Sequence, residues 1–165
     1  MSEIVEAILD DALLNGVTLF AAAAMDVVVV LLNWRLAVDE LIAMVKDADP
    51  IMLLSSASFQ SVAKAMALEI DDLFIGLADD ENLTHAVGGR IRWAPDVSGA
   101  ARRQISPLGD LLLCYTSGSS GIPKGVRLTH ANGSAACVQA RSHTPWGWRE
   151  GSVALCALPL FHIAG

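Results

Sequence analysis

One stretch constrains this chain more than any other, and it reads Tyr-Thr-Ser-Gly-Ser-Ser-Gly-Ile-Pro-Lys-Gly from Tyr115 to Gly125. The apolar run before it, residues 111–115, is short, continuous and bounded by glycines, which predicts a buried strand. This strand leads into a loop of small residues, whose backbone N–H groups can turn inward around an anion. The stretch therefore predicts a site for a negatively charged ligand at the end of a strand.

The polar groups of this loop indicate which anion it can hold. Hydroxyl groups donate hydrogen bonds, glycines leave the backbone accessible, and a lysine adds a full positive charge. This combination is suited to a polyphosphate. We predict the following ligand-binding residues: Thr116, Ser117, Gly118, Ser119, Ser120, Gly121 and Lys124.

Two other interpretations of the loop are disfavoured. A Walker A loop, G-x-x-x-x-G-K-S/T, needs a glycine directly before its lysine and a hydroxyl directly after it. Here Pro123 precedes Lys124 and Gly125 follows it, so a Walker-type NTPase fails on spacing. A serine/glycine linker is also disfavoured, because linkers do not carry an ordered Pro-Lys-Gly between two apolar strands.

The loop closely resembles the phosphate-loop signature of the adenylate-forming superfamily, S/T-S-G-S/T-S/T-G-x-P-K-G. This superfamily includes acyl-CoA synthetases, luciferases and peptide-synthetase adenylation domains. Residues 124–132, K-G-V-R-L-T-H-A-N, resemble the family sequence at the end of the signature and just after it. Residues 159–165 resemble the next motif of the family, P-L-F/Y-H-x-x-G. Residues 20–36 resemble a third segment, but Asp26 stands where the family has a glycine and Leu31 where it has a proline.

The resemblance implies an activity and a set of cofactors. Family members activate a carboxylate with ATP, release pyrophosphate and pass the acyl group to coenzyme A. By resemblance, the loop and Lys124 hold the β- and γ-phosphates, and His162 lines the acyl and adenylate pocket. Locally, His162 can also be read as a satisfied histidine at the end of a strand. Mg²⁺ is implied as well, with its ligands mostly outside this chain.

The later family motifs are not found in these 165 residues, so we expect a fragment that is inactive as an isolated chain. The alternative is a truncated, non-catalytic remnant or interaction module, which Asp26 and Leu31 also favour. The carboxylic acid is not specified by the sequence, although the residues in and around the motifs favour fatty or aryl acids. The oligomeric state is not indicated.

The expected fold class is α/β, forming an incomplete part of the large N-terminal domain of an adenylate-forming enzyme, with a mostly parallel sheet flanked by helices. Residues 1–17 are expected to hold an uncertain N-terminal helix, and 18–165 the partial AMP-binding domain. An apolar helical pattern runs over 4–24, with a break at Gly16. Strands are expected at 27–32, 51–54, 73–77, 125–128 and from 152, and helices at 39–45, 58–69 and 129–140.

Two details of these elements are specific enough to check. A left-handed conformation is expected at Asp26, because the family's glycine suits a helix cap there. Thr129 is expected to cap the helix that follows it, and Ser58 the helix over 58–69, which should turn Val62, Met66 and Leu68 inward. His130 would then be a capping or packing residue.

Charge is unevenly distributed along the chain. Residues 1–81 hold 15 acidic and 3 basic side chains, whereas residues 82–165 hold 3 acidic and 8 basic ones. The phosphate loop thus lies in the positive half, which would favour a polyanionic nucleotide. No basic run with interleaved aromatic residues is present, so nucleic acid is not an expected partner.

The cysteines and the N-terminus predict a cytoplasmic protein. Cys114, Cys137 and Cys156 are odd in number and lie in apolar surroundings, which favours reduced core thiols. The first residues are acidic and do not resemble a secretory signal. The apolar run 17–32 is interrupted by Asp26 and is shorter than the about 20 residues needed to cross a bilayer, so no transmembrane segment is expected.

Overall fold

A computed structural model describes residues 3–10, 12–78, 86–87, 105–116, 123–142, 147, 149–153 and 158–162 of the chain. The strands are β1 (Ile4–Ile8), β2 (Val28–Leu31), β3 (Met52–Ser56), β4 (Phe74–Ala78), β5 (Ala86–Val87), β6 (Asp110–Thr116) and β7 (Lys124–Thr129). The helices are α1 (Ala12–Met25), α2 (Val38–Ala48), the short 3₁₀ helix η1 (Ala57–Phe59), α3 (Gln60–Ala67) and α4 (His130–Ser142).

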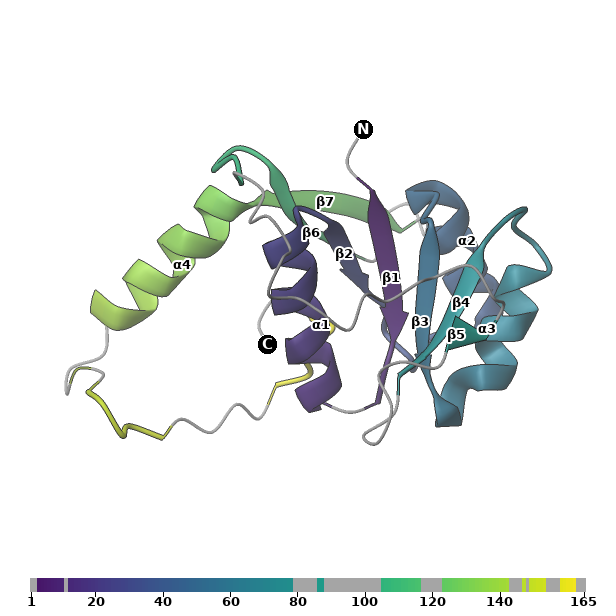
Figure 1. Ribbon diagram of the computed structural model, residues 1–165, viewed down its shortest axis with the longest axis horizontal. Helices are drawn as coiled ribbons and strands as arrows, with labels where there is room; N and C mark the ends of the chain where they lie inside the picture. Colours follow the sequence, from purple (N-terminus) through teal and green to yellow (C-terminus); the bar gives the residue numbers. More distant parts are fainter. Residues whose placement is uncertain are drawn as a thin grey trace.

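The described strands form one sheet in the order β5-β4-β3-β1-β2-β6-β7 (Figure 1). The five inner strands are parallel, and the two edge strands, β5 and β7, pair antiparallel with their neighbours. Parallel neighbours need crossover connections, which helices α1, α2 and α3 provide. The expectation of an α/β fold with a mostly parallel sheet is therefore confirmed.

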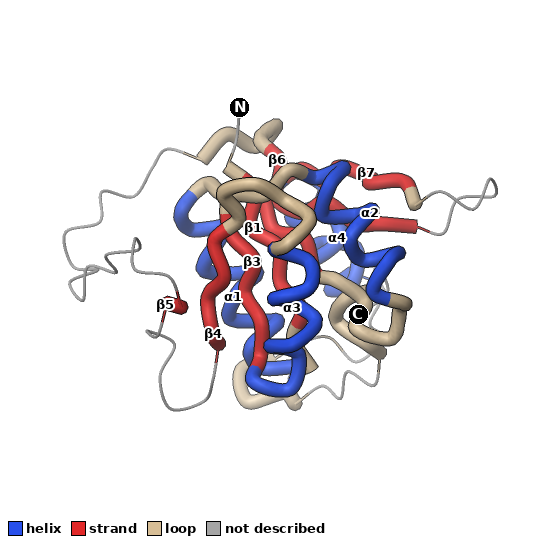
Figure 2. The backbone as a smooth tube through the Cα atoms, turned by 90° about the vertical axis from the view of Figure 1, so that its right-hand side faces the viewer, coloured by secondary structure: helices blue, strands red, loops and turns tan. Residues whose placement is uncertain are grey.

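Helices cover both faces of the sheet (Figure 2). The buried apolar residues form two layers, one on each face. One layer lies under α2 and α3 and contains Ile8, Val30, Leu41 and Met66. The other lies against α1 and contains Ala7, Leu9, Leu14 and Val29. Because successive residues of a strand point to opposite faces, β1 and β2 contribute to both layers. This explains why β2 is buried along its whole length, as its continuous β-branched run predicts.

The N-terminal helix expected over 4–24 is wrong in its first part. Residues 4–8 form β1, which pairs with β2 on one side and with β3 on the other. The apolar residues of this short run fit a strand as well as a helix, and the pairing on both sides decides between them. The helix begins at Ala12, and Gly16 lies inside it rather than at a break.

Helix α1 ends in a left-handed cap at Asp26, as expected from the family comparison. Asp26 has φ 59°, and its N–H bonds to the carbonyl of Ala23 at 3.4 Å. The N–H of Val27 bonds to the carbonyl of Ala22 at 3.0 Å. These two bonds are those of a Schellman motif, which most often has glycine at the left-handed position. Asp26 therefore holds a conformation that a side chain disfavours.

We expect Asp26→Gly to raise the free energy of unfolding by roughly 0.5–1 kcal/mol, because glycine removes the side-chain clash but loses more entropy on folding. Urea unfolding of the two proteins would measure the difference. Asp26→Ala is the matched control and should destabilise, since alanine is no better suited to a positive φ. A loss of stability in Asp26→Gly would contradict this account of the cap.

Two details of the second crossover differ from expectation. Ser58 does not cap α3, because it lies inside η1 and the N-cap position of α3 is Phe59. Leu68 was expected on the inner side of this helix, but it follows the end of α3 and is 86% exposed. Met66 is fully buried, as predicted. The helix is shorter at both ends than its apolar pattern suggested.

Glu6 lies in the middle of the central strand and is 0% exposed. Its partners in register are Val30 and Leu53, which are also fully buried. Neither carboxyl oxygen of Glu6 has a hydrogen-bond partner among the described residues. Burial raises the pKa of Glu6 from 4.5 to about 8. A carboxyl group is thus held in the core in its neutral form at pH 7.

Two expectations concerning the surface can be checked in the described residues. Cys114 is buried in β6, but Cys137 is exposed on α4, so the expectation that all three cysteines lie in the core is wrong for Cys137. Cys156 lies outside the described residues. Within the described part of the chain, none of the helices has the length and apolar character needed to span a membrane.

Candidate functional site

Strands β6 and β7 form a hairpin that brackets the predicted phosphate loop. Thr116, the last residue of β6, pairs directly with Lys124, the first residue of β7. Residues directly opposite each other in an antiparallel pair have their side chains on the same face. The side chains of Thr116 and Lys124 therefore leave the same face of the hairpin, at the base of the loop. Both residues are exposed.

The rest of the predicted loop lies outside the described residues. This applies to Ser117, Gly118, Ser119, Ser120 and Gly121, whose role remains a prediction. Strand β6 itself is as expected in position. However, it is mostly half-buried, and Cys114 is its only buried residue.

Two side chains of the facing strand approach Gly125 closely in this hairpin. A Cβ atom at this position would lie 2.9 Å from Cδ1 of Leu113 and 3.2 Å from Cζ of Tyr115. Both residues belong to β6, and Tyr115 is the direct partner of Gly125 in register. The missing side chain at Gly125 therefore lets the tyrosine ring lie across β7, one residue away from Lys124.

A pocket of about 330 Å³ opens beside the hairpin, where β2 and β6 end. These strands are parallel, so their carboxyl ends meet at one edge of the sheet, which is the usual place for ligands in α/β folds. The lining residues are Leu31, Asn33, Leu36, Glu40, Met44, Cys114, Tyr115, Thr116, Pro123, Phe161 and His162. Two predicted site residues, Thr116 and His162, therefore line the same pocket although they lie far apart in sequence.

The segment that carries His162 is held in place by aromatic packing. Phe161 meets Trp34 edge to face, with ring centroids 6.4 Å apart, and the guanidinium of Arg35 lies 5.8 Å from the centre of the Phe161 ring. The same guanidinium lies 4.9 Å from the Trp34 ring. The backbone N–H of His162 bonds to the carbonyl of Pro159 at 3.0 Å, which closes a turn. Trp34 and Arg35 thus fix one wall of the pocket.

A strand was expected to begin at residue 152 and to lead into this turn. Ser152 and Val153 are exposed and lie outside any strand, so the expectation is wrong for these two residues. Residues 154–157 lie outside the described part of the chain.

Tyr115 connects the hairpin to helix α2. Its hydroxyl donates to Oδ2 of Asp47 at 2.6 Å, with the carbonyl of Met44 as a second, longer acceptor at 3.3 Å. Burial raises the pKa of Tyr115 above its ordinary value, and the hydrogen bond to Asp47 and the negative charges of Asp47 and Glu6 raise it further. The phenol therefore stays protonated and remains a donor.

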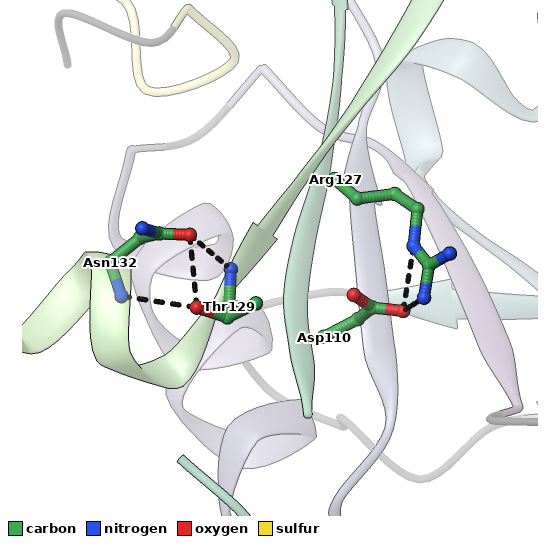
Figure 3. Close-up of polar contacts among 4 residues, drawn as sticks. All are labelled: Asp110, Arg127, Thr129 and Asn132. Atoms are coloured by element: carbon green, nitrogen blue, oxygen red, sulfur yellow. Dashed lines mark hydrogen bonds and ion pairs between the residues drawn. The ribbon is translucent and has the colours of Figure 1, made fainter. Parts of the chain in front are cut away.

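The far end of the hairpin is fixed by two polar contacts (Figure 3). The guanidinium of Arg127 bonds to Oδ2 of Asp110 at 2.6 and 3.0 Å, which links β7 to the start of β6. The Thr129 N–H donates to Oδ1 of Asn132 at 2.9 Å, and the Asn132 N–H donates to Oγ1 of Thr129 at 3.2 Å. This reciprocal pair caps α4, as predicted for Thr129.

Replacing Thr129 by alanine should lower the free energy of unfolding by about 1 kcal/mol, because the cap loses the acceptor for the Asn132 N–H. Circular dichroism during urea unfolding would measure the loss. Thr129→Ser keeps the hydroxyl and serves as the control, which should retain most of the stability. Equal stability of Thr129→Ala and the parent chain would show that the cap contributes nothing.

Metal ligands were expected mostly outside this chain. In the described ranges, no three His, Cys, Asp or Glu side chains lie close enough together to hold a metal ion. We therefore assign no described residue to Mg²⁺.

The fold and the site together define a class of protein. The structure of o-succinylbenzoate coenzyme A synthetase from Bacillus subtilis, in complex with ATP and magnesium ion, is similar to this chain with a TM-score of 0.71 and 27% identity. The match covers 99% of this chain and 39% of that one. The described residues therefore have the fold of an adenylate-forming ligase.

The family model of the AMP-binding enzymes matches residues 15–165, and the chain belongs to this family. Among the curated relatives, the feruloyl-CoA synthase of an Amycolatopsis species is 35% identical over 152 residues. The fatty acid–acyl-carrier-protein ligase of Streptomyces coeruleorubidus is 29% identical over 149 residues. Each match covers 89% of this chain and 27% of the relative, so the chain spans about a quarter of their length.

Proposed function

We propose that this chain is the nucleotide-binding portion of an ATP-dependent carboxylic acid:CoA ligase. The activity would have two steps, formation of an acyl-adenylate and transfer of the acyl group to the thiol of coenzyme A. The proposal extends the family assignment to a role for particular residues. It also assigns substrates, although the chain spans only about a quarter of the length of its relatives.

The observation that carries the proposal is that Thr116 belongs both to the hairpin and to the pocket lining. It pairs with Lys124 across the mouth of the loop, and it lines one pocket with His162. A phosphate chain bound by the loop would thus end beside the pocket that the resemblance assigns to the acyl group and the adenylate. This is the arrangement needed to bring a carboxylate close to the α-phosphorus of ATP.

The chemistry of the first step explains why these groups are needed. An oxygen of the carboxylate attacks the α-phosphorus, a new P–O bond forms, and the bond to the β-phosphate oxygen breaks to release pyrophosphate. Negative charge develops on the leaving phosphates. The ammonium of Lys124 and the donors of the loop would offset this charge and hold the leaving group in line. Magnesium would add positive charge to the same phosphates when bound.

The carboxylic acid is left open among fatty and aryl acids. The relatives named above act on ferulate, a fatty acid and o-succinylbenzoate, according to their names. The pocket in this chain has a largely apolar lining with Asn33, Glu40 and His162 among it. Such a lining suits an apolar acid with its carboxylate held at a polar end.

The test is ATP–pyrophosphate exchange by the complete gene product, with a panel of fatty and aryl acids. We expect exchange that depends on one class of acid, followed by thioester formation when coenzyme A is added. Binding of a fluorescent ATP analogue would test the nucleotide site separately. The proposal would be overturned if the complete product neither bound the analogue nor exchanged pyrophosphate with any acid of the panel.

We further propose that these 165 residues alone give little turnover. Helix α4 extends away from the sheet, and its Val138 is 68% exposed (Figure 1). Four residues of β7, from Lys124 to Arg127, are exposed as well. The helix and the outer edge of the hairpin are therefore open to solvent in the described part of these 165 residues. Acid-dependent pyrophosphate release by the isolated chain would contradict this proposal, and it would also exclude a non-catalytic remnant.

A further inference from the structure

Tyr115 is the single tyrosine of the chain, and from the end of β6 it reaches helix α2. It precedes Thr116, the last residue of β6 and the first of the predicted phosphate ligands. Its hydroxyl reaches Asp47 and Met44 on α2, which lie 68 and 71 residues away in sequence. One side chain thus connects the start of the loop to a helix from another part of the fold.

The aromatic ring of Tyr115 packs against Gly125 of β7. Gly125 lies directly opposite Tyr115, and a Cβ there would come within 3.2 Å of the ring. On its other side, the ring packs against the apolar layer beneath α2. A phenylalanine would fill the same space, so packing alone does not require the hydroxyl group.

The hydroxyl adds a directional contact that packing cannot supply. A hydrogen bond to a carboxylate is short and strong compared with a neutral one, and the 2.6 Å distance to Asp47 fits this description. Met44 and Tyr115 both line the pocket, one from α2 and one from β6. The hydrogen bond therefore sets the distance between two walls of the pocket.

We propose that Tyr115 is a positioning residue, which holds the end of β6 against α2 and thereby orients Thr116 toward the nucleotide. This inference rests on the proposed function, since it concerns the same site. It assigns the effect to one contact, the hydrogen bond between the Tyr115 hydroxyl and the Asp47 carboxylate.

The test measures kcat and KM for ATP in the pyrophosphate-exchange reaction of the complete gene product. We expect Tyr115→Phe to raise KM for ATP about tenfold, in line with the loss of one hydrogen bond to a charged group. Asp47→Ala should have the same effect. Asp47→Asn should restore KM to within about threefold of the parent, because its amide oxygen still accepts the bond.

The double variant Tyr115→Phe with Asp47→Ala separates one shared contact from two independent effects. If the two residues act through their hydrogen bond, KM of the double variant is about tenfold above that of the parent, as in each single variant. Two independent effects would instead raise it about a hundredfold. The control is Asp71→Ala, which removes an exposed carboxylate from the turn before β4. It should leave both constants unchanged.

Each outcome decides the inference. An unchanged KM in Tyr115→Phe would overturn it, as would a hundredfold rise in the double variant. A lower kcat at constant KM would also overturn it, because a merely structural loss reduces the folded fraction and not the affinity. Absence of exchange and of ATP binding in the parent protein would instead overturn the proposed function, and this inference with it.

Discussion

Replacing Lys124 by alanine is expected to lower the rate of ATP–pyrophosphate exchange by about a hundredfold to a thousandfold, the usual loss when one donor to a developing negative charge is removed. Lys124 begins β7 opposite Thr116, so the change removes the charge without disturbing the core. Most of the loss should appear in kcat, since the charge that Lys124 offsets grows in the transition state.

Two further lysine variants make this result specific. Lys64→Ala removes an exposed lysine from α3, outside the hairpin, and should leave the rate unchanged. Lys124→Arg keeps the charge but changes its shape and reach, and it should retain a measurable part of the activity. Equal rates for Lys124→Ala and the parent protein would show that this lysine does not act on the phosphates.

Replacing Glu6 by glutamine is expected to raise the free energy of unfolding by roughly 3 kcal/mol at pH 7. Glutamine has nearly the same shape as glutamate but does not ionise. In the parent chain, Glu6 is charged in the unfolded state at pH 7 and must become neutral to enter the core. The variant folds without this cost. Urea unfolding would measure the difference.

The pH dependence follows from the direction of the shift. The pKa of Glu6 rises from 4.5 in the unfolded chain to about 8 in the folded one. The stability contributed by the neutral acid is therefore complete below pH 4.5 and is lost as the pH rises toward 8. Relative to Glu6→Gln, the parent chain should lose roughly 5 kcal/mol over this range and nothing further above it.

A matched control comes from Glu3, which immediately precedes the same strand and is exposed. Glu3→Gln should change the stability by no more than a few tenths of a kcal/mol at any pH. Glu6→Leu should be more stable than Glu6→Gln, because it buries no polar group without a partner. A parallel pH profile for Glu6→Gln and the parent chain would contradict a neutral carboxyl group in the core.

Most of the fold could be predicted from local patterns. The run 27–32 is continuous and β-branched, and it forms the fully buried strand β2. The cap of α4 by Thr129 also depends on neighbouring residues alone, whereas the left-handed Asp26 was expected from the family resemblance. The beginning of the chain was harder to predict. The apolar residues of Ile4–Ile8 fit both the helical and the strand periodicity, and only pairing with β2 and β3 selects the strand.

The site could be predicted only in part. The phosphate-binding role of the loop and its lysine stays a prediction from residue types and spacing, and the pairing of Thr116 with Lys124 is known only from the structure. The pocket could not be derived, because it joins the ends of β2 and β6 to residues 158–162. Glu6 and the contact between Tyr115 and Asp47 had no local signal. A glutamate in an apolar run usually marks the solvent face, and the hydrogen bond spans 68 residues of sequence.

Three aspartates, Asp26, Asp49 and Asp72, are the described non-glycine residues with positive φ, and each lies between a helix and the next parallel strand. These turns occupy the amino edge of the sheet, opposite the edge where the pocket opens. Asp26 and Asp49 place a negative side chain at the negative end of a helix, in a conformation that suits glycine, and Asp72 has the same conformation in the turn before β4. The turns that can be stabilised by substitution and the pocket thus lie at opposite edges of the sheet. Stabilising substitutions at one edge, such as Asp26→Gly, would therefore offset the cost of destabilising substitutions in the pocket at the other edge.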